Sequence, residues 1–232
     1  MKTDWKQRIV FFIYSFMLFV VLLFTAVEWV VFNPIYFSWH YSTYAIMEDV
    51  GVPKSQLMDV TDRMLKYLKS EAPDLNYEVT IDGKTQEFFD DTDKAHMVDV
   101  KKLFEWGFFL RNLFLMIIVF TFATLYLKNP LPIMTYGQRF LRNMAGILGV
   151  FGILAGYTAL DFNRAFVLFH KLLFTNDLWL LDPDVSRLIN IVPEQFFMNT
   201  ALLIVILFIL LIVACYMGFR LLEKTSLYRE GE

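Results

Sequence analysis

Four long apolar segments recur along the chain, at residues 9–32, 106–127, 143–163 and 196–218. Each is long enough to cross the ~30 Å hydrocarbon core of a bilayer as an α-helix, at ~1.5 Å per residue. The first is longer than the apolar core of a signal peptide, and no A-x-A-like cleavage site follows it, so we expect it to remain as an anchor. The pattern therefore predicts four transmembrane helices.

The segments between these helices differ in charge. The loop at 128–142 contains three basic residues and no acidic residue, which places it in the cytoplasm by the positive-inside rule. Four spans then put both termini, 1–8 and 219–232, in the cytoplasm and the segments 33–105 and 164–195 outside. Segment 33–105 has 14 acidic and 8 basic side chains, which supports an external position only weakly.

The first outer segment has the pattern of a small folded cap. Apolar residues recur at spacings of three and four over 55–70, which predicts an amphipathic helix with Ser55 as its N-cap. Residues 77–89 alternate on both sides of Asp82-Gly83, a strong signal for a β-hairpin turn. A lone hairpin is marginally stable, so we expect it to pack on the rest of the cap.

Further helices are expected at the ends of the two outer segments. Acidic residues at 90–93 can cap a helix that starts near Lys94 and runs into the second span. The helix of the third span could continue to about His170. Asp182-Pro183 is a good pair for the N-cap and first position of a short amphipathic helix lying on the outer leaflet.

Composition identifies the class of protein. The chain of 232 residues is 57% hydrophobic and 18% aromatic, whereas soluble domains are roughly 45–50% apolar. A net charge of -3 excludes the basic surface of a nucleic-acid binder, and a single cysteine excludes an internal disulfide or multi-Cys metal site. We therefore expect an α-helical integral membrane protein, a four-transmembrane-helix bundle with a small α+β extracytoplasmic cap. Tryptophans at the expected outer boundaries fit an aromatic belt: Trp29, Trp39, Trp106 and Trp179.

Three short stretches resemble the motifs of a known family. They are KAHMVDV at 94–100, the stretch at 169–183 that starts with Phe169-His170, and PEQFF at 193–197. In these stretches and in topology the chain resembles the lipoprotein intramolecular transacylase family, Lit, four-span bacterial membrane proteins. The resemblance implies that the enzyme moves the sn-2 acyl chain of a diacylglyceryl-cysteine lipoprotein to the α-amino group of the same cysteine, and that the product is a lyso-form lipoprotein.

The residues can be tested against that chemistry. Aminolysis of an ester needs a neutral amine, and an α-amino group of pKa near 7.7–8.0 is mostly protonated at pH 7, so a general base is required. His96 precedes the second span and His170 follows the third, so both can reach the outer interface. The substrate's amine is the nucleophile, so no Ser or Cys triad is needed. Cys215, near the cytoplasmic end of the fourth span, cannot serve such a site.

Ordinary structural roles remain open for these residues. Without the resemblance, His96 and His170 would each be read as polar residues of the interface, as His40 is within its aromatic cluster. Asp99, three residues after His96, could orient that imidazole or be a common capping residue. Asn176-Asp177 could orient His170 or bind the substrate amine, but this dipeptide is also typical of turns.

Charged residues within or beside the outer thirds of the spans form a second group of candidates: Glu28, Arg111, Asp161 and Arg164. Either arginine could stabilise the tetrahedral oxyanion. The alternative is structural pairing, of Glu28 with Arg111 or of Asp161 with Arg164. Glycines spaced at three and four residues in the third span predict close helix packing and no chemistry: Gly146, Gly149, Gly152 and Gly156.

No sequence signature of a metalloprotease, a serine-hydrolase elbow or a nucleotide-binding loop occurs, so we expect no cofactor and no metal. The expected partners are a diacylated lipoprotein and membrane lipids, at the outer face of the bacterial cytoplasmic membrane. The alternative is a non-enzymatic accessory protein or a small transporter. A transporter should have charges near the bilayer midplane, whereas these cluster at one interface.

The basic loop generates a topological prediction. In a chain whose Cys215 is replaced by alanine, Gly83→Cys should react with a membrane-impermeant maleimide added to intact cells, and Gly137→Cys should react only after permeabilisation. Labelling in the reverse order would contradict every outer-face position above.

Overall fold

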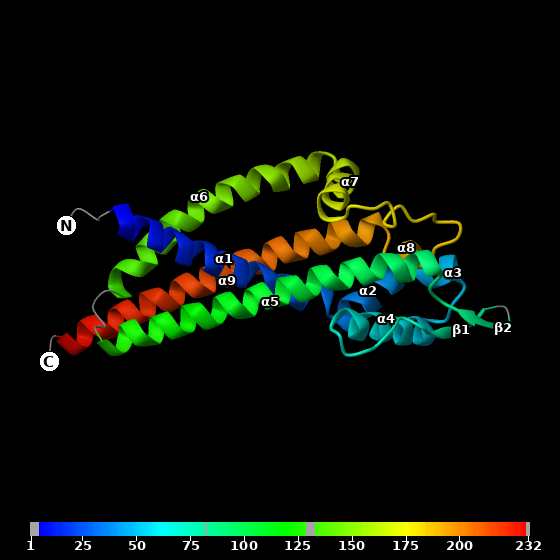
Figure 1. Cartoon of the computed structure of the whole chain (residues 1–232), viewed down its shortest axis with the longest axis horizontal. Coiled ribbons are helices and arrows are strands. Elements are labelled where there is room, and N and C mark those ends of the chain that lie inside the picture. The colour runs from blue at the N-terminus through cyan, green and yellow to red at the C-terminus, as the bar shows by residue number, and fades with distance from the viewer. Residues whose placement is uncertain (1–4, 82, 129–132, 231–232) are drawn as a thin grey trace. The chain divides into compact units, whose positions relative to one another are not determined.

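The computed structural model describes residues 5–81, 83–128 and 133–230. These residues form nine α-helices and one two-stranded sheet (Figure 1). Parts of several predictions lie outside the described residues: residues 1–4, Asp82 of the expected turn, residues 129–132 of the basic loop, and residues 231–232.

Three helices in the described part of the chain are long and apolar enough to cross a membrane. They are α1 (Trp5–Val31), α5 (Asp91–Lys128) and α9 (Glu194–Glu230). A fourth span would be formed by a bent pair, α6 (Ile133–Leu160) and α7 (Phe162–Leu173). The chain is therefore a mostly helical membrane protein with three or four candidate spans.

The third apolar segment differs most from its predicted form. Its helix α6 begins at Ile133, within the predicted loop, and ends at Leu160. Asp161 leaves the helical conformation, and its carboxylate accepts a hydrogen bond at 3.1 Å from the main-chain N–H of Arg164, so it acts as the N-cap of α7. The prediction of one helix continuing to His170 is wrong, because the capping interaction competes with continuation of the helix.

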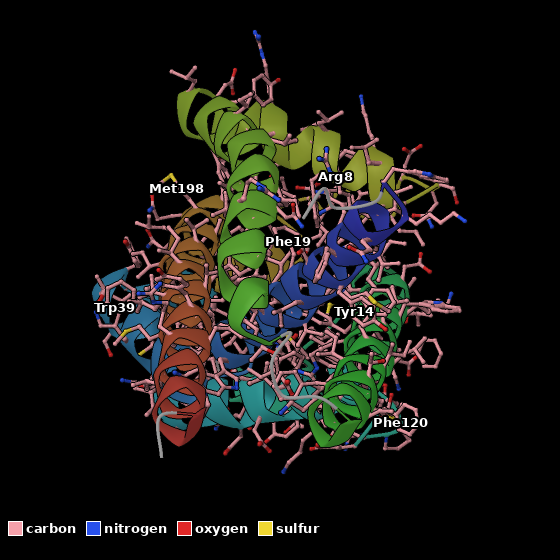
Figure 2. The ribbon with its side chains drawn as sticks, turned by 90° about the vertical axis from the view of Figure 1, so that its left-hand side faces the viewer. Arg8, Tyr14, Phe19, Trp39, Phe120 and Met198 are labelled. Carbon is pink, nitrogen blue, oxygen red and sulfur yellow. The ribbon has the colours of Figure 1, made fainter. Side chains whose placement is uncertain are left out.

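The chain divides into two compact units, and the first consists of residues 1–27, 108–160 and 204–232. Its core includes Phe19, whose ring lies 4.6 Å from that of Phe151 and 5.2 Å from that of Phe208. Large apolar side chains elsewhere in this unit face outward, as Phe120 does with 75% exposure (Figure 2). Outward-facing apolar side chains are what a lipid environment requires.

The glycines of α6 do not mark close helix packing. A methyl group placed on Gly146, Gly149, Gly152 or Gly156 would have no atom of a neighbouring helix within 4 Å among the described residues. Among the described residues, the prediction of close helix packing at these glycines is therefore wrong.

The second unit, residues 28–107 and 161–203, contains the cap. Its core joins apolar side chains from several elements, among them Phe37, Leu57, Phe88 and Ile191. Its remaining elements are α2 (Pro34–Thr43), α3 (Ile46–Val50), α4 (Lys54–Leu68), β1 (Glu78–Ile81), β2 (Lys84–Glu87) and α8 (Arg187–Ile191).

The amphipathic helix and the hairpin are confirmed. Helix α4 buries the apolar face that its spacing predicts, and β1 pairs with β2 in antiparallel register, with Val79 opposite Gln86. Gly83 has φ of 74°, in the left-handed region that glycine tolerates best. Ser55, in contrast, is not the N-cap, because α4 already starts at Lys54 after Pro53.

Helices α2 and α3 were not predicted. A local signal for α2 exists, since the Asn33 side chain accepts a hydrogen bond at 3.0 Å from the N–H of Ile35, and Pro34 occupies the first helical position. The five-residue helix α3 lies between Ala45 and Gly51, both with positive φ, and has no side-chain cap.

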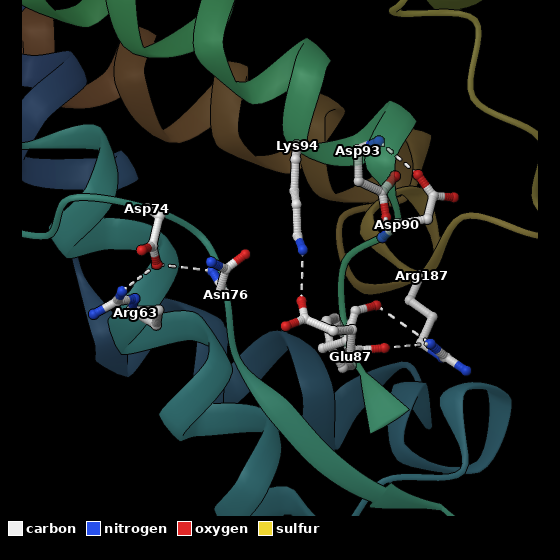
Figure 3. A network of polar contacts seen from close by, with 9 residues as sticks. Arg63, Asp74, Asn76, Glu87, Asp90, Asp93, Lys94 and Arg187 are labelled. Atoms are coloured by element: carbon white, nitrogen blue, oxygen red, sulfur yellow. Dashed lines mark hydrogen bonds and ion pairs between the residues drawn. The ribbon is translucent and has the colours of Figure 1, made fainter. Parts of the chain in front are cut away.

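The start of α5 is fixed by a capping box. The Asp90 carboxylate accepts from the N–H of Asp93 at 2.7 Å, and the Asp93 carboxylate accepts in return from the N–H of Asp90 at 3.4 Å. Beside it, Lys94 bonds Glu87 at 2.6 Å, and Arg187 donates to the main-chain oxygens of Glu87 and Phe88 (Figure 3). These contacts tie the hairpin and α8 to the first turn of α5.

The short helix of the second outer segment starts later than predicted. Ser186, not Asp182, is the N-cap of α8, accepting from the N–H of Ile189 at 3.3 Å. Leu188 and Ile191 are buried in the core of the cap, so the expected apolar face packs against protein.

Candidate active site

Two histidines from distant parts of the sequence meet in the second unit. His96 lies in the second turn of α5, and His170 lies near the end of α7. Their ring centroids are 6.2 Å apart, and only 8% and 7% of the two residues is exposed. The structure thus brings together the two residues that the sequence singles out as candidate bases.

Aromatic rings surround this pair. Phe166 and Phe174 lie with ring centroids 4.2 Å and 5.6 Å from that of His170, and Phe174 is also 5.3 Å from His96. Trp179 stacks on His170 at 5.0 Å with an interplanar angle of 27°. A polar reaction in such surroundings is shielded from water, which strengthens electrostatic interactions there.

A main-chain carbonyl determines where the His170 ring carries its proton. Nδ1 of His170 lies 2.7 Å from the carbonyl oxygen of Phe166, one turn earlier in α7. A carbonyl oxygen only accepts, so Nδ1 must be the donor. In the neutral ring, Nε2 then has a free lone pair and is the atom that can take up a proton.

Both imidazoles are outside the spanning segments. The 38 residues of α5 exceed the ~20 needed to cross a bilayer, and His96 precedes the apolar stretch that begins at Trp106. His170 lies in α7, after the break at Asp161 and beyond the third apolar segment, 143–163.

Burial keeps both rings uncharged. Burial, and secondly the nearby His170, lower the pKa of His96 from 6.5 to about 4, against an opposing effect of Asp99. Burial also lowers the pKa of His170, and its hydrogen bond to the Phe166 carbonyl opposes this. Both rings are therefore neutral at pH 7 and able to accept a proton.

Asp99 and Asn176 bond each other and not the histidines. Asn176 Nδ2 donates to Asp99 Oδ2 at 2.9 Å, and the other Asp99 oxygen accepts from Lys102 at 3.0 Å. The pKa of Asp99 is lowered, mainly by the Asn176 hydrogen bond and then by that of Lys102. Asp177 is exposed, and its main-chain oxygen accepts from the N–H of Leu180 at 3.0 Å in a turn.

Two of the charged residues near the span ends form an ion pair. Arg164 Nε pairs with Asp161 at 3.0 Å on the first turn of α7, and 78% of the Arg164 side chain is exposed. This is the structural pairing considered above. Arg111 belongs to the other unit, where its Nε donates to Asn112 at 3.2 Å and its guanidinium lies 5.1 Å from the ring centroid of Phe108.

His40 is buried and not in an interfacial belt. It is fully buried among aromatic rings, with Tyr44 at 4.9 Å and Phe196 at 5.0 Å, and within the described residues neither ring nitrogen has a hydrogen-bond partner. Burial lowers its pKa to about 4. No described atoms supply the orienting contact that His170 has.

Sequence reasoning assigned Trp179 to the aromatic belt and did not single out Phe166 or Phe174. Trp179 is 8% exposed, so the belt prediction is wrong for it, while Trp29 and Trp106 are more than half exposed. A signal for the phenylalanines exists, because aromatic side chains recur every four residues in this part of the sequence, at Phe162, Phe166, His170 and Phe174.

The described residues contain no group of three or more His, Cys, Asp or Glu side chains arranged to hold a metal ion. The chemistry that can be assigned here is proton transfer by imidazole, in a shielded site reached from two helices.

Comparisons with known proteins give the following. The sequence profile of the family described as lipoprotein intramolecular transacylase Lit matches residues 12–197. No curated protein matches the sequence significantly. The membrane integral lipoprotein intramolecular transacylase Lit from Bacillus cereus is a structural neighbour with a TM-score of 0.75 and 24% identity, over 96% of this chain and 99% of that one.

Two further neighbours are variants of the same Bacillus cereus protein, with one histidine replaced by alanine or by arginine. The alanine variant has a TM-score of 0.69 and 23% identity, over 95% of this chain and 96% of that one. The arginine variant has a TM-score of 0.70 and 23% identity, over 98% of this chain and 96% of that one. At these identities the neighbours show a shared fold.

The burial of the rings predicts their titration. The chain has three histidines, so ¹⁵N-histidine NMR in detergent can assign each signal with one substitution. His96 and His40 should remain neutral from pH 7 to about pH 5, because their folded-state pKa is about 4. Since protonation favours the unfolded state, cap stability should fall as the pH drops from 6.5 towards 4. Titration of either ring near pH 6.5 would contradict its burial.

Proposed function

The chain belongs to the lipoprotein intramolecular transacylase family, Lit, and is a membrane enzyme, and from that premise we propose that it moves the sn-2 acyl chain of a diacylglyceryl-cysteine lipoprotein to the α-amino group of the same cysteine. Membership of an enzyme family favours this over an accessory protein or a transporter. The observation that carries the proposal is the pair of buried histidine rings 6.2 Å apart, one of them with Nε2 free to accept a proton.

The reaction balances without a further reactant. The amine nitrogen attacks the carbonyl carbon of the sn-2 ester, a C–N bond forms, and the C–O bond to glycerol breaks. His170 Nε2 takes the proton from the attacking nitrogen, and the imidazolium returns a proton to the glyceryl oxygen. The product has the same number of acyl chains as the substrate, with one moved from oxygen to nitrogen.

His96 acts beside His170. Its neutral ring can donate one hydrogen bond to the ester carbonyl or to the departing glyceryl oxygen, where negative charge develops. Arg164 is a weaker candidate for that task, because it is largely exposed and already paired with Asp161. Asn176 and Asp99 serve the site indirectly, since they bond each other.

The membrane arrangement follows the sequence argument. A bundle of four transmembrane helices carries the cap on the outer face of the bacterial cytoplasmic membrane, with both termini in the cytoplasm. There the histidines reach the glyceryl ester and the N-terminal cysteine of a lipoprotein anchored by its acyl chains. The family's name supplies the lipoprotein substrate.

Substitution of either histidine tests the base. His170→Asn should lower kcat by at least about 10²-fold, because asparagine cannot take up the amine proton. His96→Asn should do the same or nearly so, because its amide does not reproduce the position of the imidazole N–H. The measurement is mass spectrometry of the N-terminal lipopeptide after reaction of purified variants. His40→Leu is the matched control and should keep wild-type turnover, because that imidazole has no described partner to lose.

Wild-type turnover in both His96→Asn and His170→Asn would remove the mechanism. Loss of turnover in only one of these variants would identify that histidine as the base and the other as a positioning residue.

Blocking the amine tests intramolecular transfer. Purified enzyme, a diacylated lipopeptide and detergent should give lyso-form product without ATP or an acyl donor, and N-acetylation of the lipopeptide should stop the reaction, because no protein nucleophile takes the acyl group. Acyl positions and free fatty acid would be measured by mass spectrometry. Release of fatty acid from the acetylated lipopeptide would mean that the enzyme is an esterase.

A further inference from the structure

Trp179 is the buried residue whose position the proposed chemistry does not explain. It lies in the irregular segment between α7 and α8, yet it is 8% exposed and its ring stacks on His170 at 5.0 Å. Irregular segments are usually the mobile parts of a fold, so a ring held flat against a candidate base requires a fixed segment.

A series of hydrogen bonds fixes this segment to α5. Trp179 Nε1 donates to the main-chain oxygen of Asn176 at 2.9 Å. The Asn176 side chain accepts from the N–H of Leu178 at 3.1 Å and donates to Asp99 Oδ2 at 2.9 Å. Asp99 is one helical turn after His96, so the helix that carries one histidine also holds the indole that packs on the other.

These contacts fix the orientation of the His170 ring. The Phe166 carbonyl holds one edge of the imidazole through Nδ1, but a single hydrogen bond at one edge does not by itself fix the tilt of the ring. Trp179 covers a face of the imidazole and restricts that tilt. With both contacts present, Nε2 has one direction in which to meet a substrate proton.

We propose that Trp179 is a positioning residue for His170, and that Asp99 and Asn176 hold Trp179 in place from α5. The proposal rests on the role of His170 as the base in the proposed function. It gives Asp99 a task at His170, whereas its spacing in the sequence suggested that it would orient His96. A misplacement of about 1 Å at a reacting group can cost about 10²-fold in rate, so the loss of this positioning should change kcat enough to be measured.

A purely structural role for Trp179 predicts something different. If the indole only fills space, its removal lowers stability and leaves kcat of the folded enzyme unchanged. If it positions His170, removal lowers kcat by about 10- to 100-fold while KM stays within about 2-fold, because substrate binding does not depend on the tilt of the ring.

Five variants separate these roles. Trp179→Leu removes the stacked face, and Trp106→Leu is its matched control at a tryptophan with 65% exposure, expected to keep wild-type kcat. Asp99→Ala removes the acceptor for Asn176, whereas Asp99→Asn keeps an oxygen that can accept from it and should restore kcat to within about 3-fold of wild type. Lys102→Ala removes the ion pair with Asp99, leaves the Asn176 hydrogen bond in place and should leave kcat unchanged.

The ring itself can be observed apart from activity. Stacking on an indole shifts the proton signals of an imidazole upfield, so the His170 C–H signals should move downfield in Trp179→Leu and in Asp99→Ala, and should keep their place in Asp99→Asn. Thermal unfolding of each purified variant identifies any that fails to fold. Because Asp99 is only partly buried, the two Asp99 variants keep the test decisive even if Trp179→Leu does not fold.

Unchanged kcat and unchanged His170 signals in folded Asp99→Ala would overturn the proposal, and so would loss of kcat that Asp99→Asn fails to restore. The failure of the proposed function has a different signature. In that case His170→Asn retains turnover, while the NMR signals still report whether Trp179 and Asp99 orient the ring.

Discussion

Two hydrogen bonds from the segment 174–191 to the first turns of α5 hold the site together. Ser186 donates to the buried carboxylate of Asp93 at 2.5 Å, and Asn176 donates to Asp99 at 2.9 Å. Without Ser186, one oxygen of this buried carboxylate would lose its donor, which would be costly, and burial raises the pKa of Asp93 even with Ser186 bonded to it. The segment therefore has one favourable position on α5. In that position His170, which precedes the segment, comes beside His96.

The aromatic surroundings of the two rings determine both their charge and how readily they pass on a proton. Burial disfavours the imidazolium in the resting enzyme, so each ring is neutral before the reaction. The same burial makes a proton taken up by His170 costly to keep, which favours its return to the glyceryl oxygen at the end of the proposed reaction. A strongly basic group would bind the proton and hold it. The environment of His170 therefore favours transfer of the proton to the product over its retention on the imidazole.

The sequence predicted elements whose causes are local. Helix α4 and the hairpin follow from spacing and turn chemistry, and the candidate histidines follow from position and residue type. The predictions that failed concern features that depend on tertiary contacts. Trp179 has the same local context as a belt tryptophan. It is buried in a segment that the hydrogen bond from Asn176 to Asp99 ties to α5, and local sequence does not predict that tertiary contact. Asp182-Pro183 has a better capping sequence than Ser186, but Ser186 is the residue that meets Asp93.

The hydrogen bond from His170 Nδ1 to the carbonyl of Phe166 has an evolutionary consequence. The acceptor is part of the main chain, one turn back in the same helix, so a change of the side chain at position 166 leaves it in place. Orientation by an aspartate or glutamate, as in many other enzymes, can be lost in one codon change. Here the tautomer of His170 is set by the backbone of its own helix and does not depend on the side chain at position 166.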